Sequence, residues 1–310
     1  MSLSQYRTSL AHENSSINSA CILHNSEYMI TGGGNDCKLK IHNMNNINQT
    51  IELPQIHTNP INGIDIANHN QWFVSGSKDK IIIYDIIKHE KINQYSTKSI
   101  NFISNNNILD CKILSNDLLV SCGENHHLNF YDLRQSGHFP HKSLNIGNDN
   151  LNSLDYDGKN LVSLASSNGN IYHLDLRNQQ LLSFETESPI VYLHYFQDQF
   201  IYRNIDGDII IHESMAQNFN QSLKISTGTK VNYKMNCFIN NNFVINSIPD
   251  KIQFWDIRRK SRLFDDLPIQ SKNQGTIFQV YSSDYDHLVA TSSDGQIHIW
   301  DNLSQYLNET

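Results

Sequence analysis

Short apolar runs, separated by polar turns rich in asparagine, aspartate and glycine, recur along the whole chain. Runs of this kind that are rich in isoleucine, valine and aromatic residues predict β-strands, and the polar residues between them predict tight turns. Several of the runs end in a bulky residue followed by an acid or an amide. These runs are 38–43, 80–85, 128–132, 171–175, 209–213, 251–256 and 296–301. The pattern indicates a chain built mainly from repeated strands.

The spacing of these runs is regular. Their last bulky residues stand at positions 42, 84, 131, 174, 212, 255 and 300, a mean interval of 43 residues. Each run is preceded by a tight polar turn, a second strand-like run and a third one further upstream, and another run follows the acid. Four strands per repeat of this length are typical of propeller blades. Because the chain has 310 residues, we predict one domain over residues 1–310 instead of two domains.

Composition narrows the class of protein. The chain holds 40 asparagines, which favour turns over long helices. Its formal net charge is −8, and its longest basic run is only Arg258-Arg259-Lys260, so direct nucleic-acid binding is not expected. No apolar window is long enough for a membrane span, and the first ten residues lack a signal-peptide pattern. We therefore expect a soluble protein that is not secreted.

The five cysteines are Cys21, Cys37, Cys111, Cys122 and Cys237. Their number is odd, their positions are scattered, and no pair has C-x-x-C spacing. This arrangement predicts free thiols that pack as small apolar side chains, and it fits a reducing compartment. We expect a cytoplasmic or nuclear location.

The repeats resemble the WD40 family, whose blades end in Trp-Asp or a degenerate form of it. Trp255-Asp256 and Trp300-Asp301 are true matches, and the other repeats carry variants. The resemblance implies an all-β, seven-bladed propeller with repeats that end near residues 43, 85, 132, 175, 213, 256 and 301. Since few residues follow Asp301, we expect residues 5–10 to supply the outer strand of blade seven and close the ring. No repeat opens with the family's Gly-His dipeptide, and only His12 and His57 stand near its usual places.

Catalytic motifs are not found in the sequence. It contains no nucleophile elbow, phosphate-binding loop, zinc-protease motif or dinucleotide-binding motif. His126 and His127 are adjacent, and neighbouring residues of a strand point to opposite faces, so they are poorly placed to hold one metal ion. The acids that end the strands recur once per blade, which a structural role explains better than acid–base chemistry. We predict a protein that is not an enzyme and needs no cofactor or metal.

Three repeats extend the terminal acid into an Asp-x-Arg box, with Arg134, Arg177 and Arg258 as the arginines. These boxes resemble those by which many WD40 substrate receptors dock on the cullin-4 ubiquitin ligase adaptor. An arginine offers a planar, charged fork to a partner's carboxylate. The alternative is that each arginine pairs with the neighbouring acid of its own box, and this structural interpretation is favoured.

A second group of candidate partner-binding residues precedes or begins the predicted innermost strands, because loops on a rigid ring are common recognition sites. The candidates are Asn62, Asn152, Tyr192, Tyr233, Lys234 and Phe278. Tyr233 and Lys234 are favoured, since a plain strand does not need a polar-aromatic pair there. For Tyr192 and Phe278 core packing remains the alternative.

Residues 168–177 and Tyr233-Lys234-Met235-Asn236-Cys237 are similar to segments of the MAP-kinase organizer family of WD40 scaffolds. Proteins of that family hold kinase-cascade complexes together and accompany spliceosomes. The resemblance implies a non-enzymatic scaffold for protein–protein interactions in a spliceosomal or kinase-signalling complex. We expect protein partners, no membrane association, and a monomer within the assembly. The alternative function is a substrate receptor of a cullin-type ligase.

Overall fold

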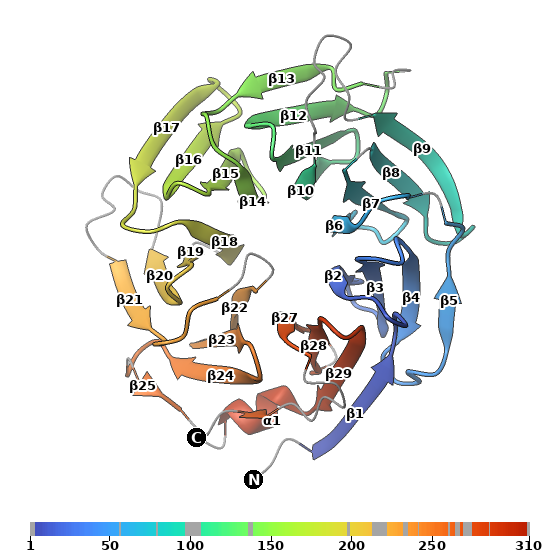
Figure 1. Ribbon diagram of the computed structural model, residues 1–310, viewed down its shortest axis with the longest axis vertical. Coiled ribbons are helices and arrows are strands. Elements are labelled where there is room, and N and C mark those ends of the chain that lie inside the picture. The colour runs from blue at the N-terminus through green and yellow to red at the C-terminus, as the bar shows by residue number, and fades with distance from the viewer. Residues whose placement is uncertain are drawn as a thin grey trace.

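The computed structural model describes residues 4–55, 57–78, 80–96, 107–135, 139–196, 199–212, 222–231, 235–240, 242–259, 261–263, 267–268, 275–284 and 286–308. Seven antiparallel sheets stand around a central axis like the blades of a propeller (Figure 1). We number the blades by the chain order of their innermost strands. The all-β, seven-bladed architecture predicted from the sequence is confirmed.

Blades one to four each contain four consecutive strands, ordered from the axis outward. The strands of blades one and two are β2 (Ile17–Ile22), β3 (Tyr28–Gly33), β4 (Leu39–Asn43), β5 (Thr50–Glu52), β6 (Ile61–Ile66), β7 (Trp72–Ser77), β8 (Lys80–Asp85) and β9 (Glu90–Ser96). Those of blades three and four are β10 (Ile108–Ser115), β11 (Leu118–Gly123), β12 (His127–Asp132), β13 (Lys142–Asn145), β14 (Leu151–Tyr156), β15 (Leu161–Ser166), β16 (Asn170–Asp175) and β17 (Gln180–Glu185).

Blades five and six continue the pattern, and blade seven is completed from the N-terminus. The strands are β18 (Ile190–Phe196), β19 (Gln199–Asn204), β20 (Asp208–His212), β21 (Ser222–Ser226), β22 (Cys237–Asn240), β23 (Phe243–Ile248), β24 (Lys251–Asp256), β25 (Ser261–Arg262), β26 (Leu267–Pro268), β27 (Ile277–Ser282), β28 (Leu288–Ser292), β29 (Gln296–Asp301) and β1 (Ser4–Leu10). A short helix, α1 (Leu303–Asn308), follows the last strand.

The expected closure of the ring by the N-terminal strand is observed. Strand β1 pairs antiparallel with β29, with Tyr6 opposite Trp300 and Leu10 opposite Gln296. The pairing is reinforced by an ion pair of 2.6 Å between Arg7 NH2 and Asp301 Oδ1. Both ends of the chain therefore contribute to one sheet, and blade seven gains its outer strand.

The apolar core lies between the blades, with one cluster of buried side chains at each junction. Strand β8 shows how this arises. Ile82 and Tyr84 pack toward blade one, whereas Ile81 and Ile83 pack toward blade three. Because successive side chains of a strand point to opposite faces, a strand between two neighbouring blades needs apolar residues at consecutive positions. This explains the dense apolar runs of the sequence.

Blade one contains a buried polar network around His12. Its Nδ1 lies 2.7 Å from Asp36 Oδ2, and its Nε2 lies 2.8 Å from Thr31 Oγ1. The Thr31 hydroxyl also lies 2.9 Å from Nε2 of His42, which occupies the blade's terminal bulky position. His12, which stands near the place of the Gly-His dipeptide, is thus part of a buried hydrogen-bonded network. His42 occupies the position that tryptophan has in a Trp-Asp repeat.

Candidate interaction surface around the central channel

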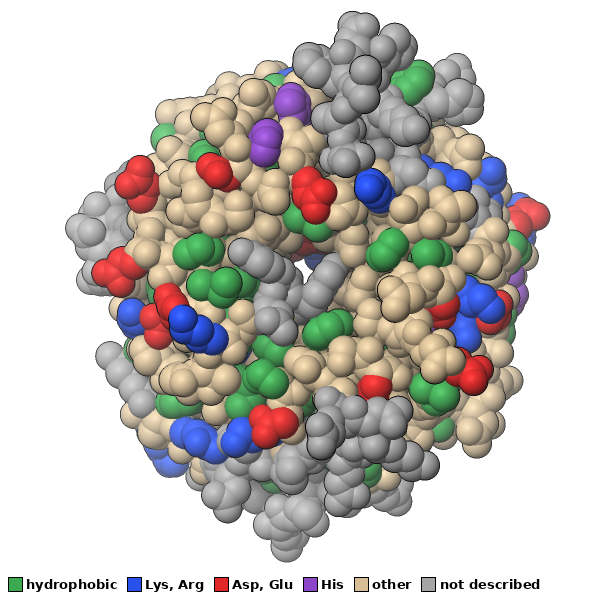
Figure 2. All heavy atoms as spheres, viewed as in Figure 1, with side chains coloured by type: hydrophobic (Ala, Val, Ile, Leu, Met, Phe, Trp, Pro, Cys, Tyr) green, Lys and Arg blue, Asp and Glu red, His purple; other side chains and the backbone are tan. Residues whose placement is uncertain are grey.

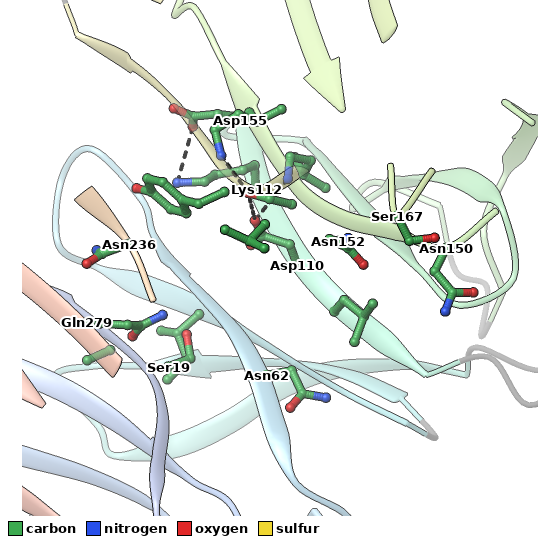
Figure 3. Close-up of a pocket in the computed structure, with 18 of the residues that line it drawn as sticks. Ser19, Asn62, Asp110, Lys112, Asn150, Asn152, Asp155, Ser167, Asn236 and Gln279 are labelled. Atoms are coloured by element: carbon green, nitrogen blue, oxygen red, sulfur yellow. Dashed lines mark hydrogen bonds and ion pairs between the residues drawn. The ribbon is translucent and has the colours of Figure 1, made fainter. Parts of the chain in front are cut away.

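The innermost strands surround a central channel, which appears as a hollow near the centre of Figure 2. A cavity of about 330 Å³ at one end of it is lined by residues of all seven blades. Among them are Asn62, Lys112, Asn152 and Gln279 (Figure 3), together with Tyr192. A second cavity, of about 360 Å³, shares Lys112 and Tyr192 with the first. These two residues therefore lie where the two cavities meet.

The two groups of predicted site residues lie on opposite faces of the ring. Strands alternate in direction within each blade, so a third strand ends on the face opposite to the one where the innermost strand begins. We call the face where innermost strands begin the upper face. Asn62 and Asn152 stand at the start of β6 and β14, hence near the upper face, whereas Arg134 and Arg177 follow the third strands on the lower face.

A β-bulge marks the second residue of six innermost strands. The strand register shifts between the first and third residues of each. The bulged residues are Asn18, Asn62, Leu109, Asn152, Val191 and Phe278. A bulge leaves a residue unpaired and re-aims its side chain. The repeat of the bulge explains why the second positions of these strands meet around the channel.

Two bulged asparagines join neighbouring blades. Asn152 Nδ2 donates to the carbonyl oxygen of Ile190 in blade five at 2.8 Å, and Asn62 Nδ2 donates to the carbonyl oxygen of Ile108 in blade three at 3.0 Å. In each case the acceptor is the first residue of the next innermost strand. The predicted site residues Asn62 and Asn152 thus have a structural role. They also line the cavity of about 330 Å³, which we call the upper cavity because it lies near the upper face.

Acidic side chains of the innermost strands make a second set of bonds between blades. Asp65 Oδ2 accepts from the backbone N–H of Ile113 at 2.7 Å, and Asp155 Oδ2 accepts from that of Tyr195 at 2.8 Å. The inner edge of each blade has no ladder partner, so its backbone N–H groups need other acceptors. These carboxylates satisfy some of them and hold adjacent blades in register.

Lys112 lies between these two carboxylates, and its contact with Asp155 is drawn in Figure 3. Its Nζ is 3.3 Å from Asp155 Oδ1 and 3.6 Å from Asp65 Oδ1. Burial alone would lower the pKa of Lys112, but the charges of Asp155, Asp65 and Asp110 outweigh burial and raise it well above its ordinary value. Lys112 is therefore a fixed positive charge in the channel wall.

The acids around Lys112 respond differently to their surroundings. Burial raises the pKa of Asp110 to about 6, because the lysine only partly offsets desolvation. Burial also raises the pKa of Asp65. For Asp155 the desolvation is outweighed by Lys112 and by His194, whose Nδ1 is 2.8 Å away, so its pKa falls well below its usual range. Three acids and one lysine give this part of the wall a negative balance.

Arg203, on β19, is fully buried and faces the junction of blades five and six. Its NH1 donates to the carbonyl oxygen of Asn236 at 3.2 Å, while Nε and NH2 have no hydrogen-bond partner among the described residues. Burial lowers the pKa of Arg203 to about 10. The corresponding position in blade one is Gly32, where an added Cβ would lie 2.6 Å from Ile61 of the next blade. Blade five therefore places a large cation where blade one has no room for a side chain.

The Asp-x-Arg boxes divide into two types. The guanidinium groups of Arg134 and Arg177 fold back onto Asp132 and Asp175, with Nε and NH2 each 2.7 to 3.0 Å from the carboxylate oxygens. Arg258 differs: its backbone N–H donates to Asp256 at 2.8 Å, but within the described part of the chain its side chain has no acidic partner. Pairing of the arginine with the acid of its own box is therefore observed for Arg134 and Arg177. Arg258 instead has an exposed side chain.

The remaining predicted residues have different outcomes. Tyr233 and Lys234 lie outside the described residues. Tyr192 lines both cavities and also packs against buried residues of blades five and six. Phe278 is half-buried at its bulge, and its carbonyl oxygen accepts from the N–H of Asn236 at 3.2 Å. Whether any of them contacts a partner remains a prediction.

Sequence reasoning missed the charged residues of the channel wall. Asp65, Asp110, Lys112 and Asp155 are the charged residues of the innermost strands β6, β10 and β14. A charge inside a buried strand is costly unless it is paired. The presence of these charges in the innermost strands was therefore the sequence signal for a charged channel wall.

Across the ranges that the structure describes, no three His, Cys, Asp or Glu side chains are grouped so as to hold a metal ion. All five cysteines are free thiols.

Three parts of the chain match the protein-family model described as WD40, WD domain, G-beta repeat. The matched residues are 4–43, 49–85 and 268–301, which include all four strands of blades one and seven and the three inner strands of blade two. These segments are similar to WD40 repeats, and they lie in three blades of the seven-bladed propeller. A search of the curated proteins gives no significant match.

No helix in the described ranges has the length and apolar character needed to cross a membrane. Propellers with WD40 repeats are typical of protein-interaction scaffolds.

Proposed function

We propose that this propeller is a non-enzymatic scaffold in a spliceosomal or kinase-signalling assembly, and that partners dock on the upper face around the channel. The observation that carries the proposal is the upper cavity, to which all seven blades contribute polar side chains. Surfaces of this kind, on a rigid ring, present recognition groups at little cost in conformational entropy. The choice of assembly rests on the resemblance to the MAP-kinase organizer family, and we propose a cytoplasmic or nuclear location to match it.

The rim of the upper cavity offers groups that a partner can reach. Glu124 is exposed, and Asn150 and Ser167 are partly exposed. Lys112 and the acids beside it lie deeper in the channel. Polar groups at a rim and fixed charges below it favour a partner segment that inserts a polar or charged side chain into the cavity.

A second candidate function is supported by Arg258. Its exposed guanidinium, unlike those of Arg134 and Arg177, is not held by the acid of its own box. An arginine in this state could bind a carboxylate of a cullin-ligase adaptor. Because Arg258 follows a third strand, this docking site would lie on the lower face, opposite the upper cavity.

Affinity purification of the tagged chain, with mass spectrometry of its partners, distinguishes the two candidates. The first predicts components of splicing or kinase complexes that are retained by Arg258→Ala. The second predicts a cullin adaptor that this substitution removes, while Arg134→Ala serves as the matched control because Arg134 is paired. Detectable turnover of a substrate by the isolated chain would contradict both.

A further inference from the structure

The outermost strand of each blade leaves one edge without a ladder partner, and such edges attract other strands. Most of the outer strands carry features that oppose this pairing. Strand β5 has three residues, and β25 and β26 have two each. Strands β13 and β21 carry Lys142 and Lys224. Strands β9 and β1 carry Lys91 and Arg7, and the register is irregular in each pairing.

Strand β17 has none of these protective features. Its sequence is QLLSFE, without a basic residue or proline, and its six residues pair with β16 in continuous register. Leu181 is 40% exposed and Leu182 is 57% exposed. Since neighbouring residues of a strand point to opposite faces, the two leucines leave apolar surface on both faces of this edge.

The hydrogen-bonding groups that β17 directs outward can be assigned from its ladder. The N–H of Thr186 donates to the carbonyl oxygen of Gly169 at 2.9 Å, one residue beyond the strand. In an antiparallel ladder, alternate residues bond to the same neighbour. Leu181, Ser183 and Glu185 therefore direct their N–H and C=O groups away from β16. No described residue pairs with these groups, so the edge offers a row of donors and acceptors.

The charges around this edge indicate what kind of strand it accepts. Glu185 is exposed. The side chain of Glu187 just beyond it is 92% exposed and makes only a long, exposed contact of 4.0 Å with Lys224 Nζ. Arg177, at the other end, is already paired with Asp175. A second copy of the chain would bring another net charge of −8 toward the same edge, which opposes self-association.

We propose that β17 accepts an extended segment of a partner protein as a fifth strand of blade four. The segment places apolar side chains beside Leu181 and Leu182, and it carries lysine or arginine near Glu185 and Glu187. Backbone hydrogen bonds supply affinity, and the side chains supply specificity. This surface is on the outer rim of the ring (Figure 1), so it is a binding site additional to the channel.

A displayed library of random nonapeptides, panned on the full chain, tests the proposal. We expect enriched peptides with alternating apolar residues and a basic end. A synthetic peptide of the enriched sequence should bind wild type and Ser183→Ala alike and bind Ser183→Pro at least about tenfold more weakly, because proline removes one outward N–H group. Amide exchange of Leu181, Ser183 and Glu185 should slow when it binds.

A second variant keeps the test independent of the folding of Ser183→Pro. Charge reversal by Glu185→Lys and Glu187→Lys together should weaken the basic peptide about tenfold, and Glu185→Gln with Glu187→Gln should weaken it less. The proposal is overturned if no peptide is enriched, or if the peptide binds all variants equally. It is also overturned if sedimentation shows wild type as a dimer that Ser183→Pro dissociates, since the occupant would then be a second copy.

Discussion

The side-chain amide of Asn152 donates to the carbonyl oxygen of Ile190 across the boundary between blades four and five, at 2.8 Å. Asn62 makes the same bond to Ile108 between blades two and three. In both pairs a bulge re-aims the asparagine, and the acceptor begins the next innermost strand. The channel wall is thus held together by side chains as well as by the apolar clusters between blades.

We predict that Asn152→Ala lowers the free energy of unfolding by about 1 kcal/mol, the usual net contribution of a hydrogen bond of this kind. Urea denaturation measures the change. Asn150→Ala is the matched control, because the main-chain carbonyl of Asn150, and not its side chain, accepts a bond from Ser167. Equal destabilisation by the two substitutions would contradict the role assigned to Asn152.

Removal of residues 1–10 should lower the melting temperature by about 10 °C or more, because β29 loses its outer partner along its whole length. Arg7→Ala should cost only a few degrees, since the partly exposed ion pair with Asp301 is screened by solvent. A synthetic peptide of residues 1–12 should restore part of the loss when added to the truncated chain. An unchanged melt of the truncated chain would refute closure by β1.

Asp110 makes the stability of the fold depend on pH. Its pKa is raised to about 6 in the folded protein, above the value near 4 of an unfolded chain, so the folded state binds the proton more tightly. This group therefore adds stability as the pH falls from about 7 to about 4. Asp110→Asn mimics the protonated acid, so its stability should not depend on this titration. We predict that the free energy of unfolding of Asp110→Asn, minus that of wild type, is about 2 kcal/mol larger at pH 7 than at pH 4.5.

Denaturation of both proteins at the two pH values measures this difference. Asp155 has the opposite shift, since its lowered pKa stabilises the fold above about pH 4 and the effect is lost in stronger acid. Asp155→Asn should therefore lose stability at pH 7, which makes it the contrasting control. A difference between wild type and Asp110→Asn that does not change with pH would contradict the raised pKa of Asp110.

Arg203→Met should stabilise the protein by about 1 to 3 kcal/mol. It replaces a buried guanidinium, of which only NH1 has a hydrogen-bond partner among the described residues, with an apolar side chain of similar length. Thermal or urea denaturation checks the sign. Arg203→Lys keeps the buried charge and should give no gain. If Arg203→Met is instead strongly destabilised, the bond to Asn236 matters more than the burial of the charge.

The sequence predicted most of the fold because one physical requirement repeats in every blade. A strand between two blades needs apolar residues at consecutive positions, as Ile81, Ile82 and Ile83 show, and the spacing of such runs is visible without a structure. The helix α1 was not foreseen. It is held by Leu303 and Leu307, which pack onto the cluster between blades six and seven, and this contact has no local pattern.

The channel was harder to predict because its contacts join residues about 40 positions apart. Asn62 and Asn152 were selected from their place in the repeat, but their bonds to Ile108 and Ile190 depend on the bulges. Lys112 becomes a paired charge of the channel wall only because the fold brings Asp155 Oδ1, from the next blade, to 3.3 Å from its Nζ. Nothing in the immediate neighbourhood of Lys112 along the chain indicates that distance.

The central claim is that partners dock on the upper face around the channel, and quantitative affinity purification tests it directly. The measured quantity is the amount of each partner retained by Glu124→Lys combined with Ser167→Arg, two changes at the rim of the upper cavity. The control is Ser222→Arg on the exposed outer strand β21, with melting curves to show that both variants are folded. We predict that the rim variant loses most of its partners and that the control keeps them. Full retention of partners by the folded rim variant would contradict the claim.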